Sequence, residues 1–116
     1  MEQPRLKCRF FRTEAGVEPV RDWLRGLPAA ERHRIGDDIR ALQFGWPIGM
    51  PLVRKLQPDL WEIRVQLVGR TARVLFTVAR DEAVLLHGFI KRSRKTPANE
   101  LATASRRLAR LKDAAK

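Results

Sequence analysis

The stretch that decides the fold runs from Leu60 to Lys91: "LWEIRVQLVGRTARVLFTVARDEAVLLHGFIK". Apolar and polar residues alternate along three runs of this stretch, and a period of two is typical of a β-strand with one buried face. Short polar segments at Gly69–Arg70 and Asp81–Glu82 separate the runs and suit hairpin turns. The pattern predicts a three-stranded antiparallel meander over Leu60–Leu67, Thr71–Ala79 and Ala83–Lys91.

The residues before the meander predict one more strand on each side of two helices. A strand-like run covers Arg5–Phe11, and another strand is expected around Leu52–Gln57. Apolar residues at helical spacing predict a helix over Val17–Leu27, ended by Pro28, and a second over Ala29–Phe44. Gly45 is expected to stop this second helix in a left-handed conformation.

A third helix is expected after the meander. Thr96 is suited to cap its first turn, with Pro97 at the first helical position. An apolar stripe of Leu101, Ala104, Leu108 and Leu111 follows. Residues 1–116 are therefore predicted to form a single α+β domain, in which a strand and two helices precede an antiparallel meander and a C-terminal helix.

The composition points to a polyanionic partner. The chain of 116 residues has a formal net charge of +11, and most of the excess lies in residues 51–116. Such a charge favours binding to nucleic acid or to an acidic protein. Cys8 is the only cysteine, so no internal disulfide can form, and it is expected to be a small core residue. Because no apolar run reaches about 18 residues, a soluble cytoplasmic protein without membrane contact is expected.

The alternation places one polar and one apolar face on the predicted sheet. The apolar face is expected to lie under the two N-terminal helices, with Trp23 and Trp61 in the core and Trp46 as a lid over it. Neighbouring strands lie only about 4.8 Å apart, so the side chains of the polar face can converge. These polar residues are Glu62, Arg64, Arg73, Thr77, His87 and Lys91, followed at the rim by Arg92, Arg94 and Lys95. Simple cross-strand ion pairs and a solvated basic loop are the alternatives.

The residue types on the polar face limit the chemistry. A two-metal nuclease needs clustered carboxylates, and Glu62 stands alone there. A nucleophilic triad needs an activated Ser or Cys, and Ser93 lies in a basic loop. Cleavage of RNA by its own 2′-hydroxyl fits, because it requires acids, bases and cations but neither a metal nor another cofactor.

Three segments carry a resemblance to a known family. "LVRKLQPDLWEIRV" (residues 52–65), "RTARVLFTV" (residues 70–78) and "VLLHGFIKRSRKTP" (residues 84–97) resemble the HigB-like branch of the RelE/ParE toxin superfamily. The resemblance implies the toxin of a type II toxin–antitoxin pair that cuts mRNA on the ribosome and is neutralised by a cognate helix-turn-helix antitoxin. Matched to the family motif, Arg64 and Arg73 are its strand arginines, and His87, Lys91 and Arg92 belong to its final-strand motif.

The resulting hypothesis is a metal-independent mRNA endoribonuclease. Arg64, Arg73 and Arg92 would hold the scissile phosphate, and Arg70, Arg94 and Lys95 would make further RNA contacts. Either His87 or Lys91 would accept the 2′-hydroxyl proton, with Glu62 orienting a neighbour or acting as the base itself. Several members of the superfamily use a tyrosine, which this chain lacks, so the assignment of acid and base stays open. The alternatives are a ParE-like toxin that binds DNA gyrase and a non-catalytic, basic nucleic-acid-binding module.

Overall fold

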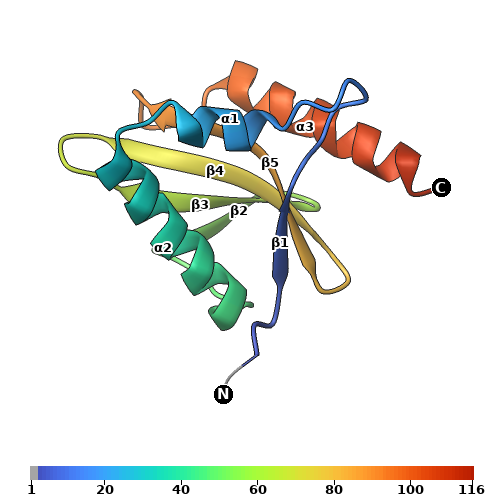
Figure 1. Ribbon diagram of the computed structural model, residues 1–116, viewed down its shortest axis with the longest axis horizontal. Coiled ribbons are helices and arrows are strands. Elements are labelled where there is room, and N and C mark those ends of the chain that lie inside the picture. Colours follow the sequence, from blue (N-terminus) through green and yellow to red (C-terminus); the bar gives the residue numbers. More distant parts are fainter. Residues whose placement is uncertain (1–2) are drawn as a thin grey trace.

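A five-stranded sheet forms the centre of the computed structural model, which describes residues 3–116 (Figure 1). The strands β2 (Val53–Gln57), β3 (Leu60–Gln66), β4 (Thr71–Ala79) and β5 (Glu82–Lys91) form an antiparallel meander. The first strand, β1 (Lys7–Phe10), pairs with β5 in parallel, so the order across the sheet is β1-β5-β4-β3-β2. The predicted α+β fold and its meander are confirmed.

Three helices complete the fold, in the predicted order. They are α1 (Pro19–Arg25), α2 (Ala29–Gly45) and α3 (Ala98–Ala114). The expectation of a left-handed Gly45 is wrong, because Gly45 is the last residue of α2 and the glycines with positive φ are Gly16 and Gly69. The residue that follows the helix and caps it is Trp46 (φ −59°, ψ 136°), whose extended backbone is the conformation favoured before a proline. Within residues 3–116, no helix combines the length and the apolar character that crossing a bilayer requires.

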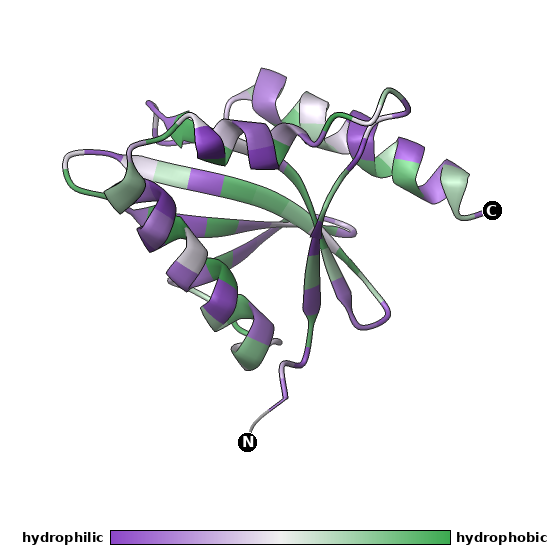
Figure 2. Ribbon diagram, in the orientation of Figure 1, coloured by the Kyte–Doolittle hydropathy of each residue, from purple (hydrophilic) through white to green (hydrophobic). Residues whose placement is uncertain are grey.

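Each face of the sheet carries its own apolar core. The helices α1 and α2 cover one face, as predicted, and α3 covers the other (Figure 1). Colouring by hydropathy shows green bands on the strands between helices of mixed character (Figure 2). The core under α1 and α2 includes Val20, Ile35, Leu42, Ile63, Val65, Val74, Phe76 and Leu85. The core under α3 includes Leu60, Leu75, Val84, Leu86, Phe89, Ala104 and Leu108.

A β-bulge in β5 changes which residues face each core. Leu75 is paired with His87, whereas the next residue, Phe76, is paired with Leu85. Leu86 is therefore the extra residue, and the strict alternation predicted for β5 is wrong at this point. Leu85 packs under α1 and α2 and Leu86 packs under α3, each opposite to the expected face. Because of the bulge, the residues of β5 from Ala83 to Leu86 face the opposite core from the one that strict alternation predicts.

Aromatic side chains close the core under α1 and α2. Trp46 packs edge-on against Trp61, with ring centroids 5.3 Å apart, and against Phe76 at 6.0 Å. Its predicted place as a lid on the core is confirmed. The ring of Trp23 covers Gly88 so closely that a Cβ atom on Gly88 would lie 2.3 Å from Trp23 Cε3. Helix α1 can approach β5 this closely because Gly88 has no side chain.

Replacement of Gly88 tests this contact. Gly88→Ala should lower the free energy of unfolding by about 1–3 kcal/mol, because the new methyl group overlaps the Trp23 ring and α1 must shift. Chemical denaturation, followed by tryptophan fluorescence, measures the change. Gly36→Ala in α2 is the matched control. A Cβ atom on Gly36 would meet no atom within 4 Å, so alanine should stabilise the helix by about 1 kcal/mol. Equal stability of the two variants would contradict the packing argument.

Candidate functional site

Four cations from four strands gather on the sheet face that α3 partly covers. In the strand register, Arg64 of β3 lies opposite Arg73 of β4, and Arg54 of β2 lies opposite Glu62 of β3. Glu62 and Arg64 are two residues apart on β3 and therefore share a face of the sheet. Their partners across the sheet, Arg54 and Arg73, project to the same side. Lys91, at the end of β5, joins them. We call this set the basic cluster: Arg54, Arg64, Arg73 and Lys91, with the carboxylate of Glu62 among them.

Glu62 is the buried anion of the basic cluster. Its exposed fraction is 0%, and that of Arg73 is 4%. The Thr96 hydroxyl donates a hydrogen bond of 3.0 Å to Glu62 Oε2. Arg73 Nε lies 3.7 Å from Glu62 Oε1, which makes an ion pair but is too long for a hydrogen bond. Glu62 Oε1 therefore accepts no hydrogen bond from any residue between 3 and 116.

Two guanidinium groups in the basic cluster have N–H donors without a hydrogen-bond partner among the described residues. Arg73 Nη1 donates to the Ala72 carbonyl at 3.1 Å, but Arg73 Nε and Arg64 Nε are buried without a hydrogen-bond partner among the described residues. Arg64 Nη1 reaches only the thioether sulfur of Met50, a weak acceptor, at 3.4 Å. Buried donors without partners are uncommon in folded proteins. Arg73 Nε faces Glu62 Oε1, which also lacks a partner, across 3.7 Å, whereas Arg64 Nε has no hydrogen-bond acceptor among the described residues.

The electrostatics of the basic cluster favour an anion. Burial lowers the pKa of Arg73, and Glu62 opposes this only in part. Burial also lowers the pKa of Lys91, and the neighbouring charge of Arg73 lowers it further, with smaller contributions from Arg64 and Arg54. Four cations thus share one carboxylate, and their mutual repulsion in a partly buried site is relieved when an anion binds.

The loop after β5 is fastened to the basic cluster. Lys91 Nζ donates to the Arg94 carbonyl, and the Ser93 hydroxyl donates to the Lys95 carbonyl at 2.8 Å. The side chains of Arg92, Arg94 and Lys95 are exposed at the rim. The expected role of Thr96 as a helix cap is wrong: Pro97 occupies the cap position of α3, without a side-chain cap, and Thr96 bonds to Glu62 instead. A buried carboxylate is the stronger acceptor, while solvent can satisfy the N–H groups of an exposed helix end.

His87 is held by α3 rather than by the basic cluster. Its Nδ1 lies 3.2 Å from Arg107 Nη1, and its Nε2 lies 3.0 Å from Glu100 Oε1. Because a guanidinium only donates, Nδ1 must be the acceptor, and the ring proton of a neutral His87 sits on Nε2 and faces Glu100. Leu75 separates His87 from Glu62 in the register of the sheet. Both ring nitrogens are therefore engaged outside the basic cluster.

The remaining predicted site residue, Arg70, lies in the β3–β4 turn and pairs with α2. Its Nε donates to Glu31 Oε2 at 2.8 Å, and its Nη2 donates to Glu31 Oε1. This hydrogen bonding lowers the pKa of Glu31 and raises that of Arg70. Arg70 is thus engaged by Glu31 and is not brought into the basic cluster.

One member of the basic cluster was missed by sequence reasoning. Arg54 lies in a strand that the sequence indicated only by its position before the meander, and its partner across the sheet depends on the β2–β3 turn. The alternation of "VRKLQ" carried the signal, because it places Arg54 on the opposite face from the buried Val53. The anchors of His87 on α3, Glu100 and Arg107, were also missed.

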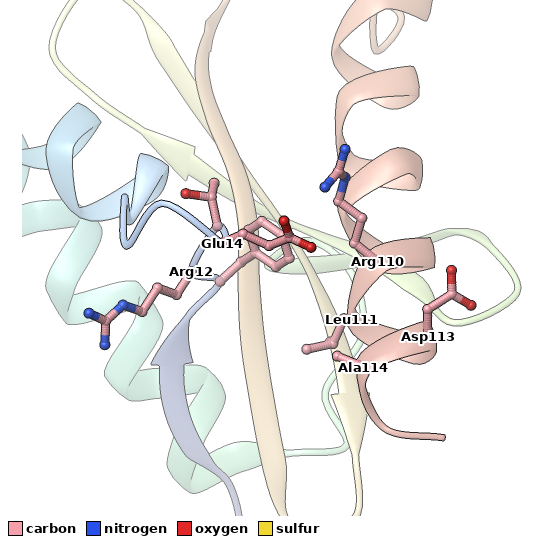
Figure 3. A pocket seen from close by; sticks show the side chains of 8 residues that line it. Arg12, Glu14, Arg110, Leu111, Asp113 and Ala114 are labelled. Atoms are coloured by element: carbon pink, nitrogen blue, oxygen red, sulfur yellow. The ribbon is translucent and has the colours of Figure 1, made fainter.

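One cavity adjoins the candidate site, and a larger one lies elsewhere. One of about 340 Å³ adjoins the basic cluster, and Arg64 and Arg73 contribute to its lining. A larger cavity of about 630 Å³ lies between the segment after β1 and the end of α3, remote from the basic cluster. In that larger cavity, the guanidinium groups of Arg12 and Arg110 point away from each other (Figure 3), so they do not form a joint anion site. Among residues 3–116, no group of three or more His, Cys, Asp or Glu side chains is placed to hold a metal ion.

Comparison with known proteins yields one family. A family model described as phage derived protein Gp49-like (DUF891) matches residues 22–109, which is well over half of the chain. The matched residues run from α1 into α3 and contain the whole basic cluster, Thr96 and His87. No curated protein matches the chain.

The hydrogen bond from Thr96 to Glu62 can be tested by stability. Thr96→Val keeps the shape of the side chain but removes a hydrogen-bond donor from a buried carboxylate, so the free energy of unfolding should fall by about 1–3 kcal/mol. Thr96→Ser is the matched control and should stay close to the unchanged protein, because it keeps the hydroxyl. Urea denaturation at neutral pH measures both. If serine and valine destabilise the protein equally, the hydroxyl is not what holds Glu62.

Proposed function

The chain belongs to the Gp49-like (DUF891) family of phage-derived proteins, a toxin-like family of the RelE/HigB-like group, and on that premise we propose that it is the toxin of a type II toxin–antitoxin pair. We propose that its activity is metal-independent cleavage of mRNA, with ribosome-bound mRNA as the substrate. The observation that carries this proposal is the basic cluster, with its buried and unpartnered arginine donors.

The basic cluster is suited to a phosphodiester. Planar guanidinium groups match the geometry of phosphate oxygens, and Arg64 and Arg73 lie opposite each other on neighbouring strands. A phosphate beside them would be held by the charge of both guanidinium groups and could accept from their terminal nitrogens, since the Nε atoms are buried. Donors that are fixed before the substrate arrives stabilise the negative charge that develops on the phosphorus oxygens in the transition state. Arg54 adds a third guanidinium from the adjoining strand.

Lys91 is the proposed acid–base group. Its pKa is lowered by burial and by nearby cations, so its amine is neutral at a lower pH than an ordinary lysine. The neutral amine takes the proton from the 2′-hydroxyl, whose oxygen attacks the adjacent phosphorus. The bond from phosphorus to the 5′-oxygen breaks, and the ammonium of Lys91 returns the proton to that oxygen. The products are a 2′,3′-cyclic phosphate and a 5′-hydroxyl, and no group outside the RNA and the chain is consumed.

Glu62 and the basic loop are given supporting roles. Glu62 has no exposed surface, so we assign it to holding Arg73 in place rather than to proton transfer. Arg92, Arg94 and Lys95 lie exposed at the rim and are proposed to contact the RNA backbone. Arg70 would add to these contacts only if it leaves Glu31.

The proposed protein partner is a cognate antitoxin with a helix-turn-helix domain. Support comes from the toxin-like family and from the exposed positive charge at the rim, which suits an acidic antitoxin segment. Expression together with the product of a neighbouring gene, followed by purification through a tag on one of the two, tests this. Repeated failure to recover both would count against the partner.

Cleavage is tested by inducing the chain in a bacterium and mapping new mRNA 5′ ends within minutes. The unchanged chain should produce new ends that carry a 5′-hydroxyl and follow codon phase. Arg64→Ala should lower the number of these new ends by about 10²-fold or more, because it removes one fixed donor. The charge of Glu62 stays paired with Arg73 in this variant. Arg73→Ala should act similarly, but its stability must be checked because it leaves the Glu62 charge unpaired. Arg40→Ala, at an exposed position on α2, is the control and should cut normally.

The other outcomes of that experiment separate the alternatives. Growth arrest with intact mRNA and a DNA-damage response would replace the nuclease with a gyrase-binding toxin. Intact mRNA without arrest, together with salt-sensitive binding of bare nucleic acid, would indicate a non-catalytic binding module.

The choice of proton-transfer group is tested separately. Lys91→Ala should lower the cleavage rate by about 10²–10⁴-fold, and Lys91→Arg should not restore it, because arginine keeps the charge but cannot act as a base near neutral pH. The rate of the unchanged protein should rise with pH as Lys91 loses its proton. His87→Gln should reduce the rate far less once folding is confirmed. A loss in His87→Gln as large as in Lys91→Ala would transfer the role to His87.

A further inference from the structure

The cavity beside the basic cluster contains polar groups that phosphate binding does not use. Its volume is about 340 Å³, within the range of sites that take small organic groups. Arg34 and Asp38 of α2 line one side, and Arg64, Gln66 and Arg73 of the sheet line the other. The segment that leads into β2 contributes an apolar wall through Pro51 and Leu52.

The cavity exists because two neighbouring strands have different lengths. β2 begins at Val53, and the Arg64 N–H donates to the Leu52 carbonyl at 2.7 Å, just before that start. β3 continues to Gln66, so its last residues have no strand beside them on that edge. Side chains of α2 can therefore reach round the edge of the sheet towards Arg64.

Asp38 is the group in this cavity that lacks a hydrogen-bond donor. Its side chain is only 12% exposed, and it pairs with Arg34 at 3.7 Å, too long for a hydrogen bond. Burial raises the pKa of Asp38, with the charge of Arg34 opposing the shift. Within residues 3–116, that loose ion pair is the only side-chain contact that compensates this carboxylate. The carboxylate lines the cavity, and its oxygens are not among the fully buried polar atoms, so they are accessible to donors from a ligand.

We propose that this cavity is a nucleobase subsite that takes guanine next to the scissile phosphate, with Asp38 as its specificity-determining residue. The subsite rests on the proposed function in that the base belongs to the RNA strand held by the basic cluster. Because Arg64 and Arg73 line both the cavity and the basic cluster, a base in the cavity and its phosphate between the arginines belong to one nucleotide or to its neighbour.

The pattern of donors and acceptors selects guanine. The Watson–Crick edge of guanine offers two adjacent donors, N1–H and the 2-amino group, which match the two oxygens of a carboxylate, and its O6 can accept from Arg34. Adenine and cytosine offer one amino group beside an acceptor nitrogen, which would face the second carboxylate oxygen. Uracil has a single donor between two carbonyl oxygens. Asp38 therefore favours guanine and repels the other three bases.

The sequence context of the mapped 5′ ends tests the subsite in cells. The unchanged chain should cut next to guanine, and Asp38→Asn should reduce this preference on the order of ten-fold or more while cleavage continues. Asp37→Asn is the matched control, because Asp37 is the adjacent acidic residue of α2 and is exposed. A preference that survives Asp38→Asn, or a preference for another base, overturns the assignment.

Binding of mononucleotides to the purified chain gives a second readout that needs neither cleavage nor a variant. Guanosine monophosphate should bind about ten-fold more tightly than inosine monophosphate, which lacks only the 2-amino group, and more tightly than uridine monophosphate. Equal affinity for all three overturns the subsite even if Asp38→Asn fails to fold. Discrimination by binding without any mRNA cleavage upholds the subsite and removes the nuclease, whereas cleavage without guanine preference does the reverse.

Discussion

A single carboxylate withdrawn from water underlies the arrangement of charge in this protein. Burying an ionised group costs several kcal/mol unless other groups compensate it. Glu62 is compensated by Arg73 on the neighbouring strand and by Thr96, which lies beyond the end of β5. One buried anion therefore joins β3, β4 and the loop that leads into α3. The basic loop cannot move far from the sheet without withdrawing the Thr96 hydroxyl from Glu62.

The same pairing explains how so much positive charge can be kept in one place. Arg73 is nearly as buried as Glu62, and without that partner its guanidinium would be an isolated charge in the sheet. With Glu62 present, Arg73 is held in position but keeps a free donor, and Arg64 beside it keeps another. The arrangement leaves three buried polar atoms without a hydrogen-bond partner among the described residues, which is compatible with the proposed phosphate ligand.

The sequence predicted what local periodicity controls and missed what tertiary contacts decide. A period of two placed Glu62, Arg64 and Arg73 on one face, and the structure agrees. The expectation that this face is polar throughout is wrong, because α3 packs a second apolar core against it. The bulge at Leu86 could not be predicted, since Leu85 and Leu86 are both leucines and each is suited to either core. The hydrogen-bond acceptor of the Thr96 hydroxyl depends on the position of Glu62 in the folded sheet, which no local sequence pattern predicts.

His87 shows the same limit from another direction. Its catalytic role stays a prediction, but no local pattern indicated that Arg107 and Glu100 of α3 would contact its two ring nitrogens. The docking of a helix on a sheet is set by apolar residues such as Leu108 and Leu86, and the partners of His87 follow from that packing. Arg107 also donates to the carbonyl of Leu86, the extra residue of the bulge, so the position of His87 and the irregularity of β5 are joined through one side chain.

The parallel pairing of β1 with β5 has a consequence for how the chain acquires its fold. Arg9 and Glu82 form an ion pair although they are 73 positions apart in the sequence. Contacts of such separation form slowly, because a long loop must close before they contribute any stability. The meander from β2 to β5 consists of neighbouring strands and can assemble early, whereas β1 must wait until Glu82 and its surroundings have been synthesised. Strand β1 precedes the meander in the sequence but is thus among the last elements to find its place, and the sheet is completed only after β5 is available.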